Sequence, residues 1–265
     1  MKNKLKYVLN FIKVLIWPII FMIGSFIIRY IFVAIFNSKE KGSMNESEFL
    51  KYISTVNYQE KLNGYINSKT LLIVIITFII LFPILYKVYK KYIKKSNYSI
   101  KDIYIPLLFG ISISLIYNIS FYNFNNIVHF TNNFDGSTIP LYIQIITTGI
   151  IGPILEEILF RGIVYNKLKE FNPTMRSIIL TSIIFGLIHF NLLNSIYAFG
   201  VSFMFIYLYE KYKTLKAPIT MHMALNITTI LTLDIIKLNY MIFNIYLVIV
   251  SIIILLFLKQ KINQR

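Results

Sequence analysis

The sequence predicts an all-α fold, a polytopic bundle of about eight transmembrane helices. Hydrophobic residues make up 57% of the 265 residues and charged residues only 14%, whereas a soluble domain of this size keeps about a quarter of its residues charged. The chain also contains several apolar runs close to the roughly 20 residues that a helix needs to cross a bilayer. We therefore expect the bilayer to be the solvent for most of this chain.

Eight segments are apolar and long enough to be read as spans. In chain order they are 9–36, 71–89, 103–124, 141–164, 176–193, 195–209, 217–235 and 239–258. The first begins shortly after Lys2, Lys4 and Lys6, as a secretory signal would. It is too long for the apolar part of a signal peptide and no small-residue cleavage site follows it, so we expect it to be retained.

Basic residues are distributed unevenly over the connecting segments. With the N-terminus in the cytoplasm, 18 Lys and Arg fall on inner segments and six on outer ones, where four glutamates offset most of them. Cytoplasmic loops are enriched in Lys and Arg, so we expect a multi-pass plasma-membrane protein with both termini cytoplasmic. The polar segment 37–70 is then an external loop or a set of short surface helices.

The formal net charge of +16 and the absence of cysteine exclude several classes of function. The lysines lie between apolar runs rather than along one stripe, which favours contact with an anionic lipid bilayer and not with nucleic acid. Without cysteine there is no disulfide, no thiolate chemistry and no cysteine-ligated metal.

Ionisable side chains inside a membrane span are costly and commonly mark a function. The segment 141–164 contains Glu156, Glu157 and Arg161. Glu157 and Arg161 are four residues apart, in the order that favours an ion pair on a helix. Glu156 points about 100° away and is left as the free carboxylate. Pro153 frees a backbone carbonyl one turn earlier. Taken alone, this cluster is equally consistent with the cytoplasmic end of a span.

Two of the three histidines also fall in predicted spans. Phe185 and His189 are four residues apart in one segment, and His222 and Asn226 are four residues apart in another. A single histidine in such a place is more often a hydrogen-bonded structural residue. Together with the glutamate pair, however, the two histidines predict a functional site.

These side chains can hydrolyse an amide bond in two ways. A glutamate helped by a histidine can take a proton from the attacking water, while a second histidine and an asparagine stabilise the oxyanion. Alternatively, Glu156, His189 and His222 can hold a divalent metal, with zinc the expected ion and water in the open position. The sequence leaves both open, one without a cofactor and one with a metal.

At these residues the chain resembles the CAAX-protease and bacteriocin-processing (CPBP, or Abi) family of intramembrane peptidases. The motifs Glu-Glu-x-x-x-Arg, Phe-x-x-x-His and His-x-x-x-Asn occur in that order at 156–161, 185–189 and 222–226. The resemblance implies four catalytic residues, Glu156, His189, His222 and Asn226. It implies three supporting residues, Glu157, Arg161 and Phe185.

The same resemblance gives each catalytic residue a role. It implies that Glu156 activates water together with His189, and that His222 and Asn226 stabilise the oxyanion or bind a metal. It covers about residues 141–235, the expected catalytic core. The flanking parts are 1–140, with the first three spans, and 236–265, with the last span and a basic tail.

The resemblance implies an intramembrane endopeptidase acting on a membrane-associated protein or peptide. Relatives without the catalytic residues act as membrane regulators, so the alternative is a non-proteolytic protein that binds a sensor kinase or an antimicrobial peptide and confers immunity. A secondary transporter is disfavoured because the sequence has no internal repeat. The complete Glu/His/His/Asn set favours the peptidase, and the oligomeric state is not predicted.

Overall fold

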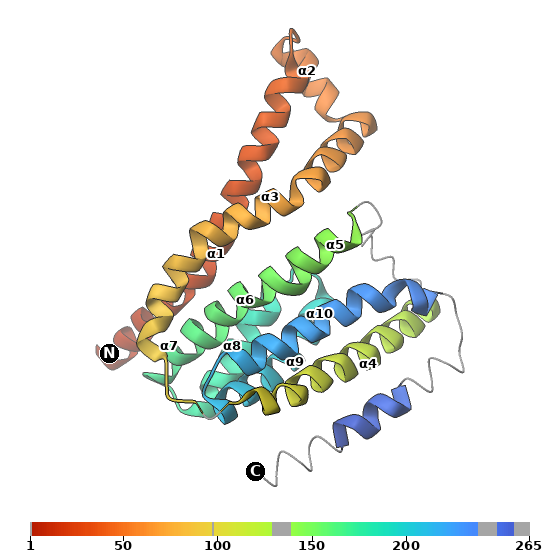
Figure 1. Ribbon diagram of the computed structural model, residues 1–265. Coiled ribbons are helices and arrows are strands. Elements are labelled where there is room, and N and C mark those ends of the chain that lie inside the picture. The colour runs from red at the N-terminus through yellow and green to blue at the C-terminus, as the bar shows by residue number, and fades with distance from the viewer. Residues whose placement is uncertain (1, 97, 129–138, 238–247, 257–265) are drawn as a thin grey trace.

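The computed structural model describes residues 2–96, 98–128, 139–237 and 248–256. All regular secondary structure in these ranges is helical, which confirms the predicted all-α class. Figure 1 shows a long helical hairpin at the N-terminal end of the chain, which leans against a bundle formed by the later helices.

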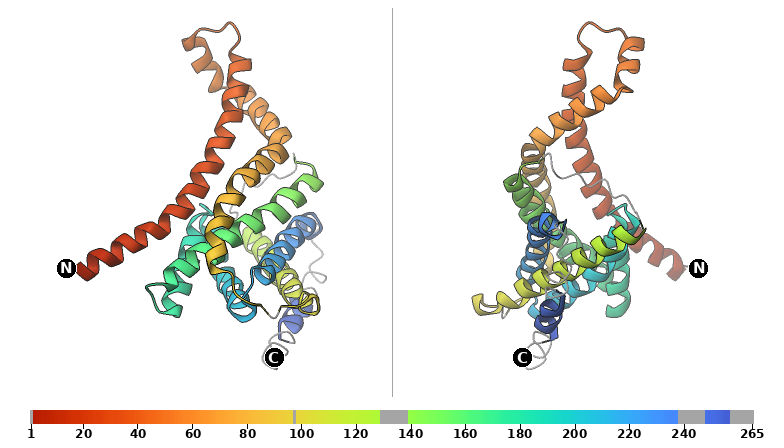
Figure 2. Two further views of the ribbon diagram at one scale, coloured as in Figure 1. Left: turned by 60° about the vertical axis from the view of Figure 1, so that its left-hand side comes forward. Right: turned by 90° about the vertical axis from the view of Figure 1, so that its right-hand side faces the viewer.

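The hairpin contains three helices. They are α1 (Lys2–Lys41), α2 (Glu46–Ile53) and α3 (Val56–Tyr89). Figure 2 shows that the far ends of α1 and α3, joined by α2, extend away from the bundle. Asn45 begins α2 with a capping box that it forms with Glu48. The polar segment 37–70 is therefore mostly helical: it comprises the end of α1, all of α2 and the start of α3.

The bundle follows two short 3-10 helices, Lys90–Tyr92 and Ile100–Asp102. Its elements are α4 (Tyr104–Val128), a long helical segment (141–169), α8 (Thr174–Leu187), α9 (Leu192–Tyr212) and α10 (Lys216–Lys237). Residues 155–168 of the long segment are almost all buried, so this half-helix is the centre of the core.

Helices α4 and α10 pack very closely. A Cβ at Gly110 of α4 would lie 2.3 Å from the carbonyl oxygen of Met221, so only glycine permits this approach. Further along the pair, the hydroxyls of Ser114 and Thr229 are 2.8 Å apart, and the Asn118 amide donates to Thr232 Oγ1 at 3.2 Å. Small residues and interhelical hydrogen bonds are what hold helices together where lipid removes the hydrophobic driving force.

The segment 141–169 is one continuous helix that enters the π-helical hydrogen-bond register twice. Its parts are α5 (Leu141–Gln144), the π-helical η4 (Ile145–Ile151), α6 (Gly152–Glu157), the π-helical η5 (Ile158–Tyr165) and α7 (Asn166–Lys169). Such π-helical turns are rare and occur frequently at functional sites. Here they flank α6, which carries both glutamates at its end.

Five helical stretches among the described residues are long and apolar enough to cross a membrane, so the count of eight spans is not confirmed. They are Lys4–Lys41, Val56–Tyr92, Ile100–Ser120, Leu141–Lys169 and Leu192–Tyr212. The expected span 176–193 corresponds to α8, whose 14 residues cover only about 21 Å. The expected span 217–235 corresponds to α10, and 239–258 lies mostly outside the described residues.

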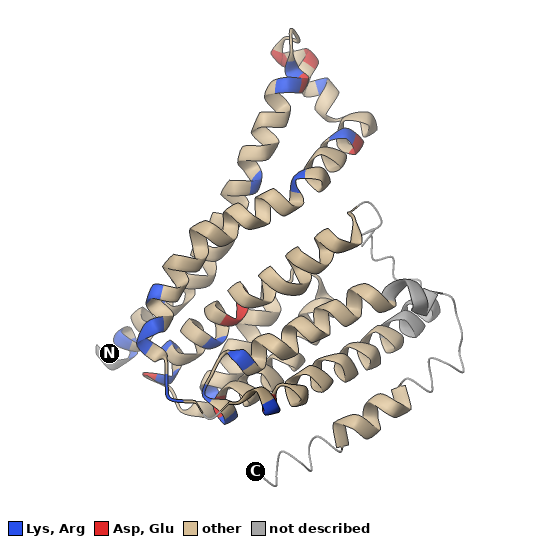
Figure 3. Cartoon of the chain, in the orientation of Figure 1, with Lys and Arg blue, Asp and Glu red and all other residues tan. Residues whose placement is uncertain are grey.

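Basic side chains gather at one end of the molecule. Figure 3 shows them around the N-terminal end of α1, the C-terminal end of α3, α7 and the start of α10. Four segments that the sequence places on one side of the membrane therefore lie together, as an alternating topology requires; the tail at 259–265 is outside the described residues. A second group, with charges of both signs, surrounds α2 at the other end.

Candidate active site

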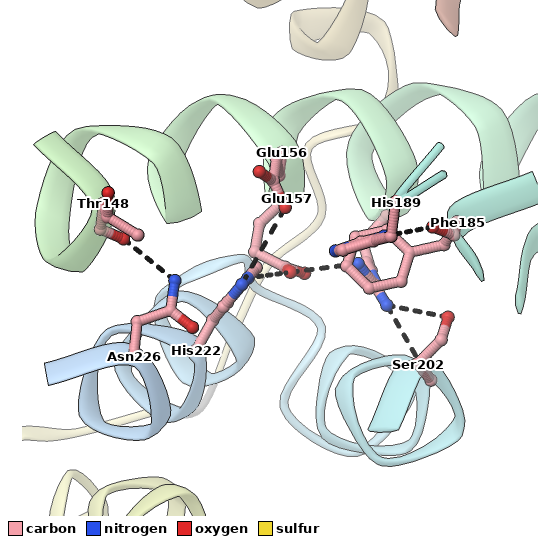
Figure 4. Close-up of polar contacts among 9 residues, drawn as sticks. Thr148, Glu156, Glu157, Phe185, His189, Ser202, His222 and Asn226 are labelled. Carbon is pink, nitrogen blue, oxygen red and sulfur yellow. Dashed lines mark hydrogen bonds and ion pairs between the residues drawn. The ribbon is translucent and has the colours of Figure 1, made fainter. Parts of the chain in front are cut away.

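The motif side chains converge between α6, the α8–α9 connection and α10. Figure 4 shows Glu156, Glu157 and His222 pointing toward one another, with Asn226 turned to Thr148 and His189 turned to Phe185. The end of α6 and the start of η5 provide Glu156, Glu157 and Arg161, whereas α10 provides His222 and Asn226. Three motifs that are separated by up to 70 residues in the sequence thus meet in one region of the bundle.

Glu157 and Arg161 form the ion pair that their spacing predicts. Arg161 Nη1 donates to Glu157 Oε1 at 3.0 Å, and both side chains are fully buried. The Arg161 guanidinium also lies between the rings of Phe185 and Phe205, at 4.4 and 4.7 Å from their centroids. Its Nη2 donates to Ser202 Oγ at 2.8 Å. Pairing, hydrogen bonding and ring contacts together offset the high cost of burying this cation.

Glu157 has a second partner that the spacing did not predict. His222 Nδ1 lies 2.8 Å from the same Oε1 atom that accepts from Arg161. A carboxylate oxygen can only accept, so the proton is assigned to Nδ1. The His222 ring is further fixed by stacking on Phe205, with 4.7 Å between the ring centroids. The other ring nitrogen, Nε2, is therefore held in one direction and left available for chemistry.

That nitrogen faces the free carboxylate. Glu156 Oε2 lies 3.8 Å from His222 Nε2, and the Glu156 side chain is 25% exposed whereas that of Glu157 is fully buried. Two atoms at this separation can both contact one water molecule at about 2.8 Å. The structure therefore brings Glu156 and His222 together and separates the roles of the two adjacent glutamates.

His189 occupies a different position from the one expected. Helix α8 ends at Leu187, and His189 lies in the turn before α9, where Phe190 has a positive φ of 54°. Its Nδ1 is 2.8 Å from the carbonyl oxygen of Phe185. Within the described residues it is linked to the cluster through the Phe185 ring, whose centroid is 5.1 Å from that of His189 and 6.2 Å from that of His222. A direct contact between His189 and Glu156 is not formed there.

Asn226 is anchored by a carbonyl that Pro153 releases. Gly152 N–H bonds the carbonyl of Thr147, five residues back. In the same register an N–H at position 153 would bond Thr148, but proline has none. The Asn226 amide donates to the Thr148 oxygen instead, at 2.9 Å. Pro153 thus does free a backbone acceptor, and the π-helical register decides which one.

The three-residue metal site that the sequence left open is not assembled. Among the described residues, no three His, Asp or Glu side chains are grouped so that they could hold a metal ion. Glu156 and His222 offer two donors, whereas the ring of His189 is directed to the Phe185 carbonyl. The residues as placed do not fit a set of two histidines and one glutamate around zinc.

Sequence reasoning missed Ser202 and Phe205, which complete the surroundings of Arg161. Both belong to α9, where they are three residues apart and so share a face. The available signal was Ser202 itself, a polar residue with apolar neighbours on both sides that the structure buries. Its pairing with Arg161 joins two helices that no motif connects.

Comparison with known proteins agrees with the motif resemblance. Residues 138–228 match the model of the family described as type II CAAX prenyl endopeptidase Rce1-like. YdiL of Bacillus subtilis (strain 168), a protein assigned as a membrane peptidase, is 36% identical over 88 residues. These residues are 33% of this chain and 35% of YdiL, so the match spans about a third of that relative. No solved structure matches this chain.

All seven predicted site residues lie inside the matched segment, and the ion pair and the Glu156–His222 pair are formed within it. The resemblance to the CAAX-protease family is therefore confirmed: residues 138–228 of this membrane protein are similar to the Rce1-like family of type II CAAX prenyl endopeptidases.

Proposed function

We propose that this protein is an intramembrane endopeptidase that cleaves a peptide bond of a membrane-associated protein or peptide. The observation that carries the proposal is the pair formed by Glu156 Oε2 and His222 Nε2 at 3.8 Å, with His222 oriented from its other side by Glu157. A carboxylate and an imidazole that share one water position are the groups that hydrolysis of an amide bond needs.

In the proposed reaction, Glu156 accepts a proton from water as the water oxygen bonds to the peptide carbonyl carbon. His222, in its protonated form, donates from Nε2 to the developing oxyanion, and Glu157 stabilises the imidazolium. Asn226 keeps one amide N–H beyond its bond to Thr148, and this N–H is the second oxyanion donor. As the C–N bond breaks, Glu156 returns its proton to the leaving nitrogen.

His189 and Phe185 have supporting places in this scheme. The His189 ring, held by its bond to the Phe185 carbonyl, borders the site where the substrate backbone enters. We further propose that both chain termini are cytoplasmic and that the site opens to that half of the bilayer, since the basic segments gather at one end.

The test is a cleavage assay with the purified full-length protein in vesicles and a library of quenched fluorescent peptides carrying a lipid anchor. Glu156→Gln keeps the size of the side chain and removes the base, so turnover should fall by about 10²–10⁴-fold. Glu60→Gln makes the same chemical change at an exposed position of α3 and should leave turnover unchanged. Equal cleavage by both variants would refute the proposal and favour a non-proteolytic regulator.

Metal dependence is measured in the same assay. The side chains as placed can act without a metal, so turnover is expected to survive dialysis against a chelator. Stoichiometric zinc in the purified protein, together with loss of turnover on chelation and recovery on adding zinc, would instead assign Glu156 and His222 as metal ligands.

A further inference from the structure

A basic pocket lies away from the site, where the N-terminal part of α1 meets α7. It is a cavity of about 320 Å³ lined by Lys6, Asn10, Lys13, Val14, Lys167, Glu170 and Phe171. The α1 residues stand at positions 6, 10, 13 and 14, which lie on one face of that helix. Three lysines from two separate parts of the chain therefore share one cavity.

The pocket is held in shape by contacts around it. The Tyr7 hydroxyl donates to Asn172 Oδ1 at 3.0 Å, and the Tyr7 ring packs on Phe171 with 5.5 Å between centroids. On the other side, Lys167 Nζ lies 5.9 Å from the centroid of the Trp17 ring. These contacts fix α1 against the α7–α8 connection.

The positive charge in the pocket is not balanced by the protein. Lys169 and Lys91 nearby have carboxylate partners, Glu210 at 2.8 Å and Glu170 at 3.4 Å, whereas Lys6, Lys13 and Lys167 form no ion pair within the described part of the chain. Glu170 is the single acid of the pocket, and its oxygen already accepts from the Tyr92 hydroxyl at 2.6 Å. This bond, with the charges of Lys91 and Lys167, lowers the pKa of Glu170 below its usual value, so Glu170 is a single negative charge against the three lysines of the pocket.

The location of the pocket favours a lipid over a soluble anion. Lys13 lies about 10 Å further along α1 than Lys6, within the span predicted from residue 9, whereas Lys6 precedes that span. Between Lys13 and Arg29 the exposed side chains of α1 are apolar. They include Ile16, Ile19, Ile20 and Ile23. A phosphate in the pocket can thus continue into acyl chains lying along these side chains.

We propose that the pocket formed by Lys6, Lys13 and Lys167 binds the phosphate headgroup of an anionic phospholipid. Basic pockets between transmembrane helices bind such headgroups by charge, each lysine strengthening binding by about fivefold. The bound lipid bridges α1 and α7 and so ties the N-terminal hairpin to the bundle that carries the catalytic residues.

The test uses the full-length protein in detergent and native mass spectrometry, with phosphatidylglycerol and phosphatidylcholine as probes. The double variant Lys13→Gln/Lys167→Gln should retain phosphatidylglycerol about 25-fold more weakly than the natural protein. The matched control is Lys94→Gln/Lys95→Gln, which removes two exposed lysines from the connection between α3 and α4. It should retain this lipid normally.

Three outcomes would overturn the proposal: equal losses in both double variants, equal retention of the two lipids, or displacement of phosphatidylglycerol by millimolar inorganic phosphate. The last result would assign the pocket to a soluble anion. If the double variant elutes as aggregate, Lys13→Arg and Lys13→Gln replace it, because only the second removes the charge. Retention that is equal in these two single variants would also count against a lipid held by charge at Lys13.

Discussion

A single oxygen atom, Glu157 Oε1, joins the two halves of the buried polar network. It accepts from Arg161 and from His222 Nδ1, at 3.0 and 2.8 Å. Arg161 is in turn bound to Ser202 of α9. Glu157 therefore connects three helices, directly or through Arg161. It also determines which ring nitrogen of His222 faces Glu156.

Replacing Glu157 with alanine should destabilise the protein strongly. Arg161 would remain fully buried without its partner, and removal of one member of a buried ion pair costs about 3–5 kcal/mol. Thermal unfolding of the purified variant in detergent measures this loss.

The double variant Glu157→Leu/Arg161→Met is the control for that experiment. It removes both charges, and such replacements recover much of the stability, but it should stay inactive because His222 loses its orientation. Normal stability and activity in Glu157→Ala would show that the pair carries neither role.

At the scale of helices, the motifs predict which side chains share a face but not how the helices end. The i, i+4 spacing correctly predicts the Glu157–Arg161 pair because one turn of helix suffices for it. The end of α8 was missed because neither glycine nor proline directly follows it; Gly186 lies within its last turn. The usable signal is Asn191, which caps α9 by accepting from the amides of Leu193 and Asn194.

For the site too, the sequence motifs predict which residues take part but not the contacts that depend on the path of the backbone. The motifs identified residues that come together, including Glu156 and His222. They could do so because an ionisable side chain inside a bilayer is costly in free energy and commonly has a function. The bond from Asn226 to Thr148 could not be predicted, since it depends on the π-helical register around Pro153. The resulting position of His189 depends on a turn with positive φ, which its flanking sequence does not indicate.

Gly110→Ala should separate α4 from α10. The added Cβ would lie 2.3 Å from the Met221 oxygen, a distance that side-chain movement cannot relieve, and overpacking of this kind costs about 1–3 kcal/mol. Gly64→Ala is the matched control, because nothing lies within 4 Å of a Cβ at Gly64 in α3; it should be neutral or raise stability by up to about 1 kcal/mol. Both are compared by thermal unfolding, and equal midpoints would contradict the tight packing.

At the scale of the whole molecule, the two ends differ in the charges of their side chains. One end is basic, and the other end, around α2, carries both signs. We expect the basic end to face the cytoplasm. The polar composition of 37–70 predicted either a loop or short surface helices, and the structure has helices. The capping box formed by Asn45 and Glu48 is a sequence pattern that favours the helix.

Single cysteines test this orientation cleanly, because the chain contains none. In intact cells, an impermeant thiol reagent should label Ser43→Cys, beside α2, and should label Lys94→Cys only after the membrane is opened. Both positions are exposed, so accessibility reports the side of the membrane and not burial. The reverse pattern would invert the topology and place the basic end outside.

The length of the hairpin has a consequence for how the chain can be divided. From Lys6 to Arg29 on α1 is about 34 Å, and from Lys87 back to Lys69 on α3 is about 27 Å, close to the 30 Å of the hydrocarbon. We therefore expect the turn at Gly42, about 20 Å beyond Arg29, to lie in water outside the headgroups. A nick there would sever the backbone while leaving both pieces embedded by their own apolar helices, so the protein is suited to assembly from two separately inserted fragments.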